Sequence, residues 1–318
     1  MIPGTLYGVK TVPGTDHAWA VGDANGAHLI LHWTGFRWLR MTNPNPPTGD
    51  CPALAGVTAI STTSAWAVGS FFQNNDVGGA AAPLTLHWNG TRWSTVASPD
   101  PGGEDGDSCL FDVSRIPDTS DVWAVGTYHA GIPDECCWYP LILYWDGHTW
   151  SQVPTPPAPG NAHLTGVAAT SPTDAWAVGT YGILHWDGTS WSQVADGSFL
   201  SVSADSATDA WAVGDKTTSH WDGTSWSQVS SPSPVHFFAV KAMSPTQAWG
   251  VGSYHNGGGG RIVHWDGTRW SVVSPKLGGG FLYGVSGNLH THQAWAVGEE
   301  AGRVVILHLT GGRWYQMA

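Results

Sequence analysis

Short runs in which bulky and small side chains alternate recur along the whole chain. The clearest is Ala-Trp-Ala-Val-Gly, in which Trp and Val alternate with small residues, so a strand built from it has one bulky face and one small face. The motif occurs seven times with small variations, at a mean spacing of 46 residues; its tryptophans are Trp19, Trp66, Trp123, Trp176, Trp211, Trp249 and Trp295. This period is typical of β-propeller blades of four short strands, so seven copies predict seven blades.

A second pattern predicts the other strands of each repeat. Residues 184–191 read Leu-His-Trp-Asp-Gly-Thr-Ser-Trp, and 220–226 and 264–270 repeat this pattern closely. Asp-Gly between aromatic-rich runs predicts a tight hairpin, because Gly readily takes a positive φ. A short apolar run also precedes each Ala-Trp-Ala-Val-Gly motif. We therefore expect an inner strand A (Leu-x-Gly-Val), strands B (Trp-Ala-Val-Gly) and C (Leu-His-Trp), and an outer strand D (Trp-Ser-x-Val).

The predicted fold is all-β: one seven-bladed propeller domain of four-stranded antiparallel blades over residues 1–318. The expected blades cover approximately 1–43, 44–98, 99–154, 155–195, 196–231, 232–275 and 276–318. The chain opens on a strand A at 6–9 and closes on a strand D at 314–316. Blade seven should therefore pack on blade one without a "velcro" blade shared between the two termini.

These motifs resemble known propeller repeats. Trp-Ala-Val-Gly followed by the segment 183–191 is similar to the Asp-box repeats of photosystem II assembly factors, and the strand-B Gly and strand-D Trp resemble Kelch repeats and the galactose oxidase propeller. The chain departs from Kelch in having one Gly after strand B, and from the Asp box in lacking the leading Ser-x-Asp. The resemblance covers the whole chain but only scaffold positions, so it implies a fold and no activity.

The chain has 21 Trp, and three per blade would account for all of them. Leu309 replaces one, however, and Trp138 lies outside the pattern. Burial of ~150–250 Å² per indole supplies an ample core. A periodic His before the strand-C Trp, with Tyr144 in its place in blade three, is expected to be structural because it follows the repeat; these residues are His32, His87, His185, His220, His264 and His308.

Charge and composition narrow the partners and the location. The net charge is −12 with only 12 Lys and Arg and no basic stripe, which argues against a nucleic-acid partner. No apolar run approaches the ~18–20 residues of a membrane span, and residues 1–5 show no signal-peptide features. Few Lys, abundant Trp, Gly and Pro, and four Cys predict an exported bacterial protein that is extracellular or bound to the cell surface.

The irregular segments are predicted to share one face of the disc, which we call the loop face. The A–B and C–D turns are short, whereas the B–C and D–A connections vary greatly in length. Function is usually carried on such loops. All four cysteines (Cys51, Cys109, Cys136 and Cys137) fall there, and two disulfides with three possible connectivities are favoured over metal ligation.

Counting back four residues from the strand-A Val gives equivalent positions expected at the channel mouth: Thr5, Ala53, Cys109, His163, Ser198, His236 and Phe281. Cys109, His163 and His236 would suit copper, zinc or iron, and Tyr, His and Cys on this face resemble the galactose oxidase copper centre without a match of individual ligands. The alternative is that they are surface residues with local hydrogen bonds. An acidic loop could instead hold calcium, although a solvated loop is favoured; its residues are Asp100, Glu104, Asp105 and Asp107.

Three function classes remain open. The first is a recognition propeller for a glycan or protein ligand, bound through Trp138 and the matching pairs Tyr128-His129 and Tyr254-His255. The second is a metal-dependent enzyme at the His/Cys ring, and the third is a structural or assembly module of a bacterial surface. No catalytic signature motif occurs. We place recognition ahead of the enzyme. The oligomeric state is left open.

Overall fold

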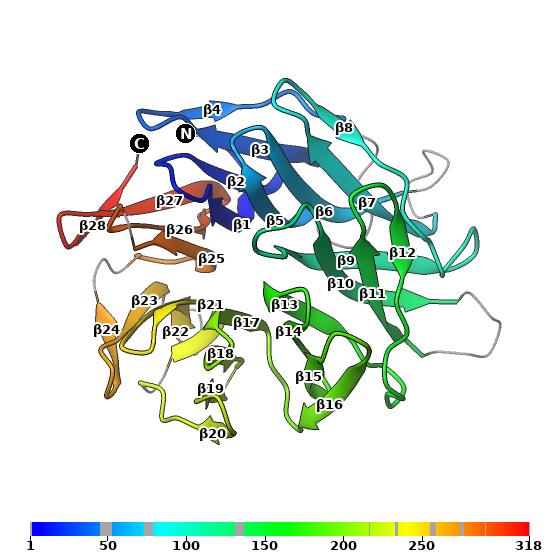
Figure 1. Ribbon diagram of the computed structural model, residues 1–318. Coiled ribbons are helices and arrows are strands. Elements are labelled where there is room, and N and C mark those ends of the chain that lie inside the picture. Colours follow the sequence, from blue (N-terminus) through cyan, green and yellow to red (C-terminus); the bar gives the residue numbers. More distant parts are fainter. Residues whose placement is uncertain are drawn as a thin grey trace.

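The computed structural model describes residues 2–44, 53–72, 79–130, 137–215, 217–232, 235–254, 259–273, 277–289 and 291–317. These residues form seven four-stranded antiparallel sheets arranged as blades around a central axis (Figure 1). Each sheet uses four consecutive strands, and the first strand of each blade lies against the first strands of both neighbouring blades. The predicted seven-bladed propeller is confirmed. Among the described residues no helix is long and apolar enough to cross a membrane.

The blades have these strands, from inner to outer. Blade one has β1 (Thr5–Thr11), β2 (Ala18–Ala24), β3 (Ala27–Trp33) and β4 (Trp38–Arg40). Blade two has β5 (Leu54–Ser61), β6 (Ser64–Phe72), β7 (Ala81–Trp88) and β8 (Trp93–Thr95). Blade three has β9 (Asp107–Arg115), β10 (Val122–His129), β11 (Tyr139–Trp145) and β12 (Trp150–Gln152). Blade four has β13 (Leu164–Ser171), β14 (Asp174–Gly179), β15 (Gly182–Trp186) and β16 (Trp191–Ala195).

Blade five has β17 (Ser201–Ser206), β18 (Asp209–Val213), β19 (Thr218–Trp221) and β20 (Trp226–Gln228). Blade six has β21 (Val235–Ser244), β22 (Gln247–Tyr254), β23 (Gly260–Trp265) and β24 (Trp270–Val273). Blade seven has β25 (Phe281–Asn288), β26 (Gln293–Glu300), β27 (Arg303–Thr310) and β28 (Arg313–Gln316).

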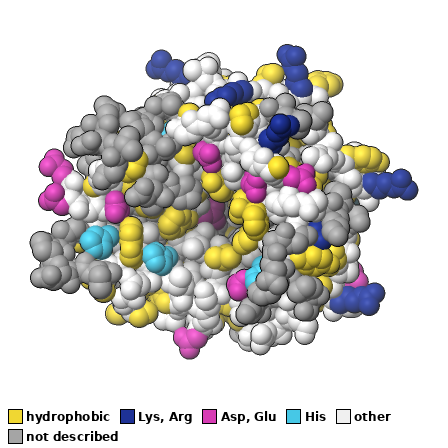
Figure 2. Space-filling model, turned by 180° about the vertical axis from the view of Figure 1, so that it is seen from behind, with side chains coloured by type: hydrophobic (Ala, Val, Ile, Leu, Met, Phe, Trp, Pro, Cys, Tyr) yellow, Lys and Arg dark blue, Asp and Glu magenta, His cyan; other side chains and the backbone are white. Residues whose placement is uncertain are grey.

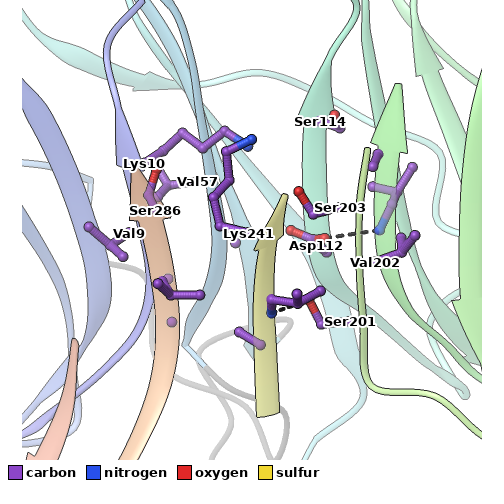
Figure 3. A pocket seen from close by; sticks show the side chains of 18 of the residues that line it. Val9, Lys10, Val57, Asp112, Ser114, Ser201, Val202, Ser203, Lys241 and Ser286 are labelled. Atoms are coloured by element: carbon purple, nitrogen blue, oxygen red, sulfur yellow. Dashed lines mark hydrogen bonds between the residues drawn. The ribbon is translucent and has the colours of Figure 1, made fainter. Parts of the chain in front are cut away.

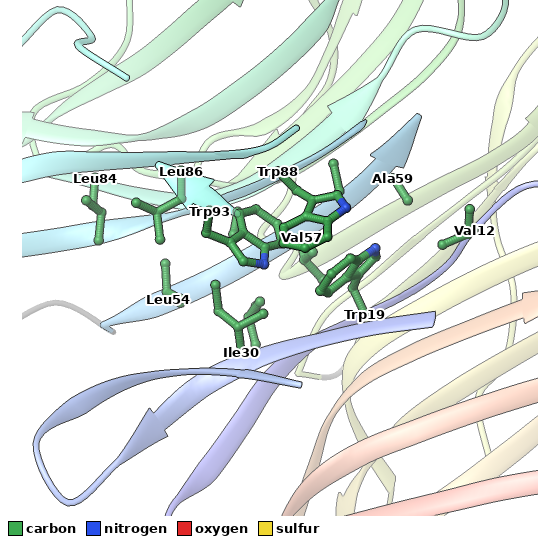
Figure 4. Packing of buried hydrophobic residues seen from close by; sticks show 13 residues of the cluster. Val12, Trp19, Ile30, Leu54, Val57, Ala59, Leu84, Leu86, Trp88 and Trp93 are labelled. Carbon is green, nitrogen blue, oxygen red and sulfur yellow. The ribbon is translucent and has the colours of Figure 1, made fainter. Parts of the chain in front are cut away.

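Tryptophans pack the blades against one another. Trp19 of β2 contacts Trp88 and Trp93 of blade two at centroid distances of 5.3 and 5.1 Å (Figure 4). The same geometry repeats around the ring and closes it where Trp295 of blade seven contacts Trp33 of blade one at 4.9 Å. Offset and edge-to-face contacts are the favoured arrangements of aromatic rings, so the repeat builds one continuous aromatic belt.

The periodic His residues are part of this belt. Each of the six lies cross-strand from the strand-B Trp and packs on its ring, most closely where Trp295 stacks on His308 at 3.9 Å. Several also use a ring nitrogen in the scaffold, as in the 2.7 Å contact of His220 Nε2 with Asp209. Tyr144 takes the same place in blade three, where its hydroxyl donates to Asp121 at 2.6 Å. Their predicted structural role is confirmed.

The ring closes as expected: in the part of the chain that the structure describes, each blade is built from four consecutive strands and none takes strands from both ends. The Thr11 N–H of β1 donates to Ser286 Oγ of β25 at 3.1 Å. An isolated antiparallel bridge also joins Pro3 to Arg303, the first residue of β27. Blade seven is therefore held to blade one by backbone bonds in addition to side-chain packing.

Candidate functional site

The first strands of the seven blades enclose a central channel of about 590 Å³. Successive positions along these strands make tiers of side chains around the channel. Because each strand runs from the D–A loop to the A–B turn, its early residues lie near the loop face and its later residues lie deeper. Two tiers differ from one blade to the next, and they define the candidate site.

The upper tier comes from a bulge in the inner strand. In blade one the pairing of β1 with β2 skips Tyr7, because Leu6 pairs with Gly22 and Gly8 pairs with Val21. The same shift occurs in every blade except blade five. A bulge changes the direction in which the side chain of the unpaired residue points. Here that residue lines the channel. The upper tier is Tyr7, Ala55, Phe111, Thr165, Leu200, Phe238 and Tyr283.

Aromatic rings gather on one side of this tier. Tyr283 lies 5.5 Å from Tyr7, 5.4 Å from Phe238 and 5.8 Å from Phe281 between ring centroids. We call these four residues the aromatic cluster; each is half-buried. Burial and the neighbouring Asp23 raise the pKa of Tyr7 to about 12, so its hydroxyl stays protonated even at moderately alkaline pH. Hydrophobic side chains border a hollow near the centre of the face in Figure 2.

The deeper tier is the position after the strand-A Val: Lys10, Thr58, Ser114, Ala168, Ser203, Lys241 and Ser286. Four of these residues carry hydroxyls that bind the inner strand of the next blade. Thr58, Ser114, Ser203 and Ser286 accept the N–H groups of Arg115, Ala169, Ala242 and Thr11 at 3.1 to 3.2 Å. An unpaired strand edge is a liability that proteins usually cover. We call this set the hydroxyl tier, since it satisfies the edge of each following blade.

Lys10 and Lys241 interrupt the hydroxyl tier in blades one and six. Their side chains reach toward one another in the channel, with Asp112 on the opposite wall (Figure 3). An ammonium group only donates hydrogen bonds, so neither lysine can accept the N–H that a hydroxyl would bind. In the part of the chain that the structure describes, neither ammonium has a hydrogen bond or an ion pair with a carboxylate.

Burial controls the charges in the channel. Burial and, after it, the nearby positive charge of Lys10 together lower the pKa of the Lys241 ammonium to about 8. Burial also lowers the pKa of Lys10 and raises the pKa of the Asp112 carboxyl to about 6. Asp112 already accepts the backbone N–H of Val167 of the next blade at 2.9 Å. Its carboxylate is therefore partly used by the scaffold.

Comparison with known proteins extends the description of the fold. No family model matches the chain, and no curated protein matches it in sequence. Among solved structures, YCF48 bound to a D1 peptide is 18% identical, with a TM-score of 0.58 over 96% of this chain and 88% of that chain. The six-bladed fucose-binding lectin of Aleuria aurantia is 12% identical, with a TM-score of 0.53 over 99% and 96%. U3-55K is 12% identical, with a TM-score of 0.64 over 99% and 92%.

At these identities the likeness shows the fold alone. The chain is a β-propeller. The resemblance to propellers of the photosystem II assembly factor type, inferred from the repeat motif, is confirmed at this level. The Kelch-type resemblance, the bacterial origin, the exported location and the absence of a nucleic-acid partner stay predictions.

The structure brings some of the predicted ligand residues together. The Trp138 ring lies 5.8 Å from His129 of the same blade and 5.9 Å from His163 of blade four. The Trp138 carbonyl also accepts the Ala162 N–H at 3.1 Å, and its own N–H donates to Asn161 at 3.3 Å. Trp138 is half-buried and is held in place by the loop that leads into blade four.

Tyr128 and Tyr254 are more strongly tied to the scaffold. Tyr128 packs on its cross-strand neighbour Tyr139 at 5.5 Å. The Tyr254 ring is covered by the guanidinium of Arg261, 3.8 Å from its centroid, and Arg261 is itself only 2% exposed. His255 lies outside the described residues. The assignment of these residues to a ligand stays a prediction.

The predicted metal ring is not assembled as a cluster. Cys109 is fully buried on β9, and His236 contacts Asp215 through Nδ1. Among the described residues, no group of three or more His, Cys, Asp or Glu side chains could hold a metal ion. The copper, zinc or iron site with His163 therefore stays an untested prediction.

The cysteine and calcium predictions are tested only in part. Cys51 and Cys136 lie outside the described residues, so the disulfides stay predictions. In the acidic loop, Asp107 accepts the Ala81 N–H at 2.7 Å, which gives this carboxylate a structural use at the start of β7. A calcium role for Asp100, Glu104 and Asp105 stays a prediction.

Sequence reasoning placed Phe281 at the channel mouth but missed Lys10, Lys241 and the other three rings of the aromatic cluster. The signal was present, because aligning the seven strand-A segments shows Lys in two repeats where most of the others have Ser or Thr. Blade-specific residues were expected on the loops, where function is usually carried. The distinctive residues lie instead within the inner strands.

Proposed function

We propose that this protein is a recognition propeller that binds a peptide segment of a protein ligand across the loop-face mouth of its central channel. The observation that carries the proposal is the aromatic cluster. Its rings occupy inner-strand positions whose residue type changes from blade to blade, and they remain partly accessible in a protein that buries all seven of its strand-B indoles. Aromatic side chains that converge on a concave site are typical of binding surfaces.

A second accessible aromatic group lies across the ring. The aromatic cluster comes from blades one, six and seven, whereas Trp138 with its two His neighbours belongs to blades three and four. An extended ligand could contact both groups, which favours a chain molecule over a monosaccharide. Both groups lie toward the loop face.

The structural neighbours are consistent with this choice. One is a YCF48 propeller in complex with a D1 peptide, and another is a lectin with a fucose recognition mode. A lectin with several equal sites needs the same pocket in each blade, but the upper tier of this chain differs between blades. We therefore favour a peptide.

The proposal is tested by selecting binders from a displayed random-peptide library and by probing a glycan array in parallel. For a selected peptide, Phe238→Ala and Trp138→Ala should each weaken binding in calorimetry by ~1–3 kcal/mol, the usual range for an aromatic anchor. Phe36→Ala is the matched control, because Phe36 is 91% exposed in a C–D turn away from the mouth.

If Phe238→Ala and Trp138→Ala both leave the affinity for the selected peptide unchanged, these aromatic groups are not part of the binding site. If the glycan array shows binding and the library yields no peptide, the ligand is a carbohydrate and the peptide proposal is wrong.

A further inference from the structure

Two features of the lysine pair indicate more than a scaffold role. Lys10 and Lys241 are two of only four lysines in a chain of net charge −12, and both lie in the central channel. Each also occupies a position where four other blades use a hydroxyl to bind the next blade. Positions that give up a local structural advantage are expected at functional sites.

We propose that Lys10 and Lys241 form an oxyanion-binding site in the channel, which takes a carboxylate or phosphate group of the bound ligand. This inference rests on the proposed function only for the identity of the ligand that carries the anionic group. The binding site itself is defined by the two lysines. The two side chains come from β1 and β21, on either side of β25, and converge in the cavity (Figure 3).

Electrostatics favours an anion between them. Two like charges enclosed by protein repel each other, and an opposite charge nearby stabilises their charged forms. Asp112 and Asp205 share the channel, and Asp205 acts on Lys241, but among the described residues neither carboxylate forms an ion pair with a lysine. Asp112 also accepts the N–H groups of Val113 at 2.8 Å and Val167 at 2.9 Å. Arg115 of β9 adds a further positive charge that acts on both lysines.

The chemistry of the site fits an oxyanion. Ammonium groups donate charge-assisted hydrogen bonds to carboxylate and phosphate oxygens, which are stronger than neutral ones. Ser286, whose hydroxyl already binds Thr11, lies between the two lysines in the same tier. The aromatic cluster lies above the lysines, so the channel offers an apolar mouth over a cationic interior.

The experiment titrates the full chain with sodium sulfate, sodium phosphate and sodium succinate in calorimetry at constant ionic strength and pH 7. Sulfate is a dianionic probe, and the other two anions separate a phosphate source from a carboxylate source. We expect saturable binding of at least one of them. Lys10→Ser and Lys241→Ser should each weaken that binding about tenfold or more.

Ser is the residue of three other blades at this position, so these variants are expected to fold; Lys10→Gln and Lys241→Gln provide a second pair. Arg313→Ser is the matched control, since it removes one positive charge from an exposed site on β28. Absence of saturable binding by the wild-type protein, or equal binding by the lysine variants and Arg313→Ser, would overturn the proposal.

The outcome is separable from the peptide test. Binding of anions by a protein that selects no peptide would support the oxyanion site and leave the proposed function unsupported. If the protein binds peptides but the lysine substitutions do not change its affinity for anions, the proposed function is supported and the oxyanion site is overturned.

Discussion

At the scale of single residues, the channel lysines differ from ordinary surface lysines in their protonation. Burial lowers the pKa of Lys241 from 10.5 to about 8. A lysine whose pKa is depressed in the folded state adds stability above the unfolded value, and that contribution is lost as the pH falls through the folded value. At neutral pH its charge therefore opposes folding, while it remains available to an anion.

This shift predicts how anion binding depends on pH. The charged groups that act on Lys241 are Lys10, Arg115, Asp205 and Asp209. As the pH rises from 7 to 9, Lys241 should lose its proton and sulfate affinity should fall, whereas a lysine of ordinary pKa would keep its charge. Sulfate itself remains a dianion over this range, so calorimetry at the two pH values isolates the protein's contribution. An affinity for sulfate that is the same at pH 7 and pH 9 would show that Lys241 titrates outside this pH range or does not contact the anion.

At the scale of the strand, the inner edge of each blade can use a hydroxyl acceptor from the blade before it, and four blades supply one. Ser203 does so in blade five by accepting the Ala242 N–H at 3.1 Å, and both residues are buried. The equivalent residue in blade four is Ala168, which carries no hydroxyl. A buried N–H without an acceptor loses the free energy of its hydration.

The two blades therefore make a matched pair. Ser203→Ala should lower the free energy of unfolding by ~1–3 kcal/mol, because it leaves a buried N–H unsatisfied. Ala168→Ser should leave stability unchanged or raise it, since it supplies the hydroxyl that blade four lacks. Urea unfolding measured for both variants checks the prediction, and equal effects of the same sign would contradict it.

At the scale of the whole molecule, stability depends on closing a ring. Trp295 of blade seven is 1% exposed and contacts Trp33 and Trp38 of blade one at 4.9 and 5.0 Å. This contact joins the last repeat to the first, so it links residues far apart in the sequence. Its loss removes packing from both ends of the belt.

Trp295→Ala should destabilise the protein by ~3–5 kcal/mol, the usual cost of a large buried aromatic truncation. Phe36→Ala, at a side chain that is 91% exposed, should change stability by less than about 0.5 kcal/mol. Thermal unfolding followed by near-UV circular dichroism would compare the two. Similar melting temperatures for both variants would argue that ring closure does not depend on this contact.

The repeat made the fold predictable, because alternation in strand B, the Asp-Gly hairpins and the period each constrain the same blade. The site was harder to predict, since its residues come from blades one, six and seven and meet only when the ring closes. The inner-strand bulge is an example: Tyr7 is unpaired because Leu6 and Gly8 pair with adjacent residues of β2. No pattern within a single repeat reveals which rings will face one another across the channel.

The bulge also separates a variable position from constrained positions in each inner strand. Its extra residue pairs with no partner strand, so it can be Tyr, Ala, Phe or Thr in different blades while the neighbouring positions stay similar. A close approach keeps the next position small in most blades: a Cβ on Gly56 would lie 2.9 Å from the Cα of Asp112. The repeat therefore provides one such variable position in each bulged blade. New binding preferences could then evolve, or be engineered by randomising this tier, without rebuilding the scaffold.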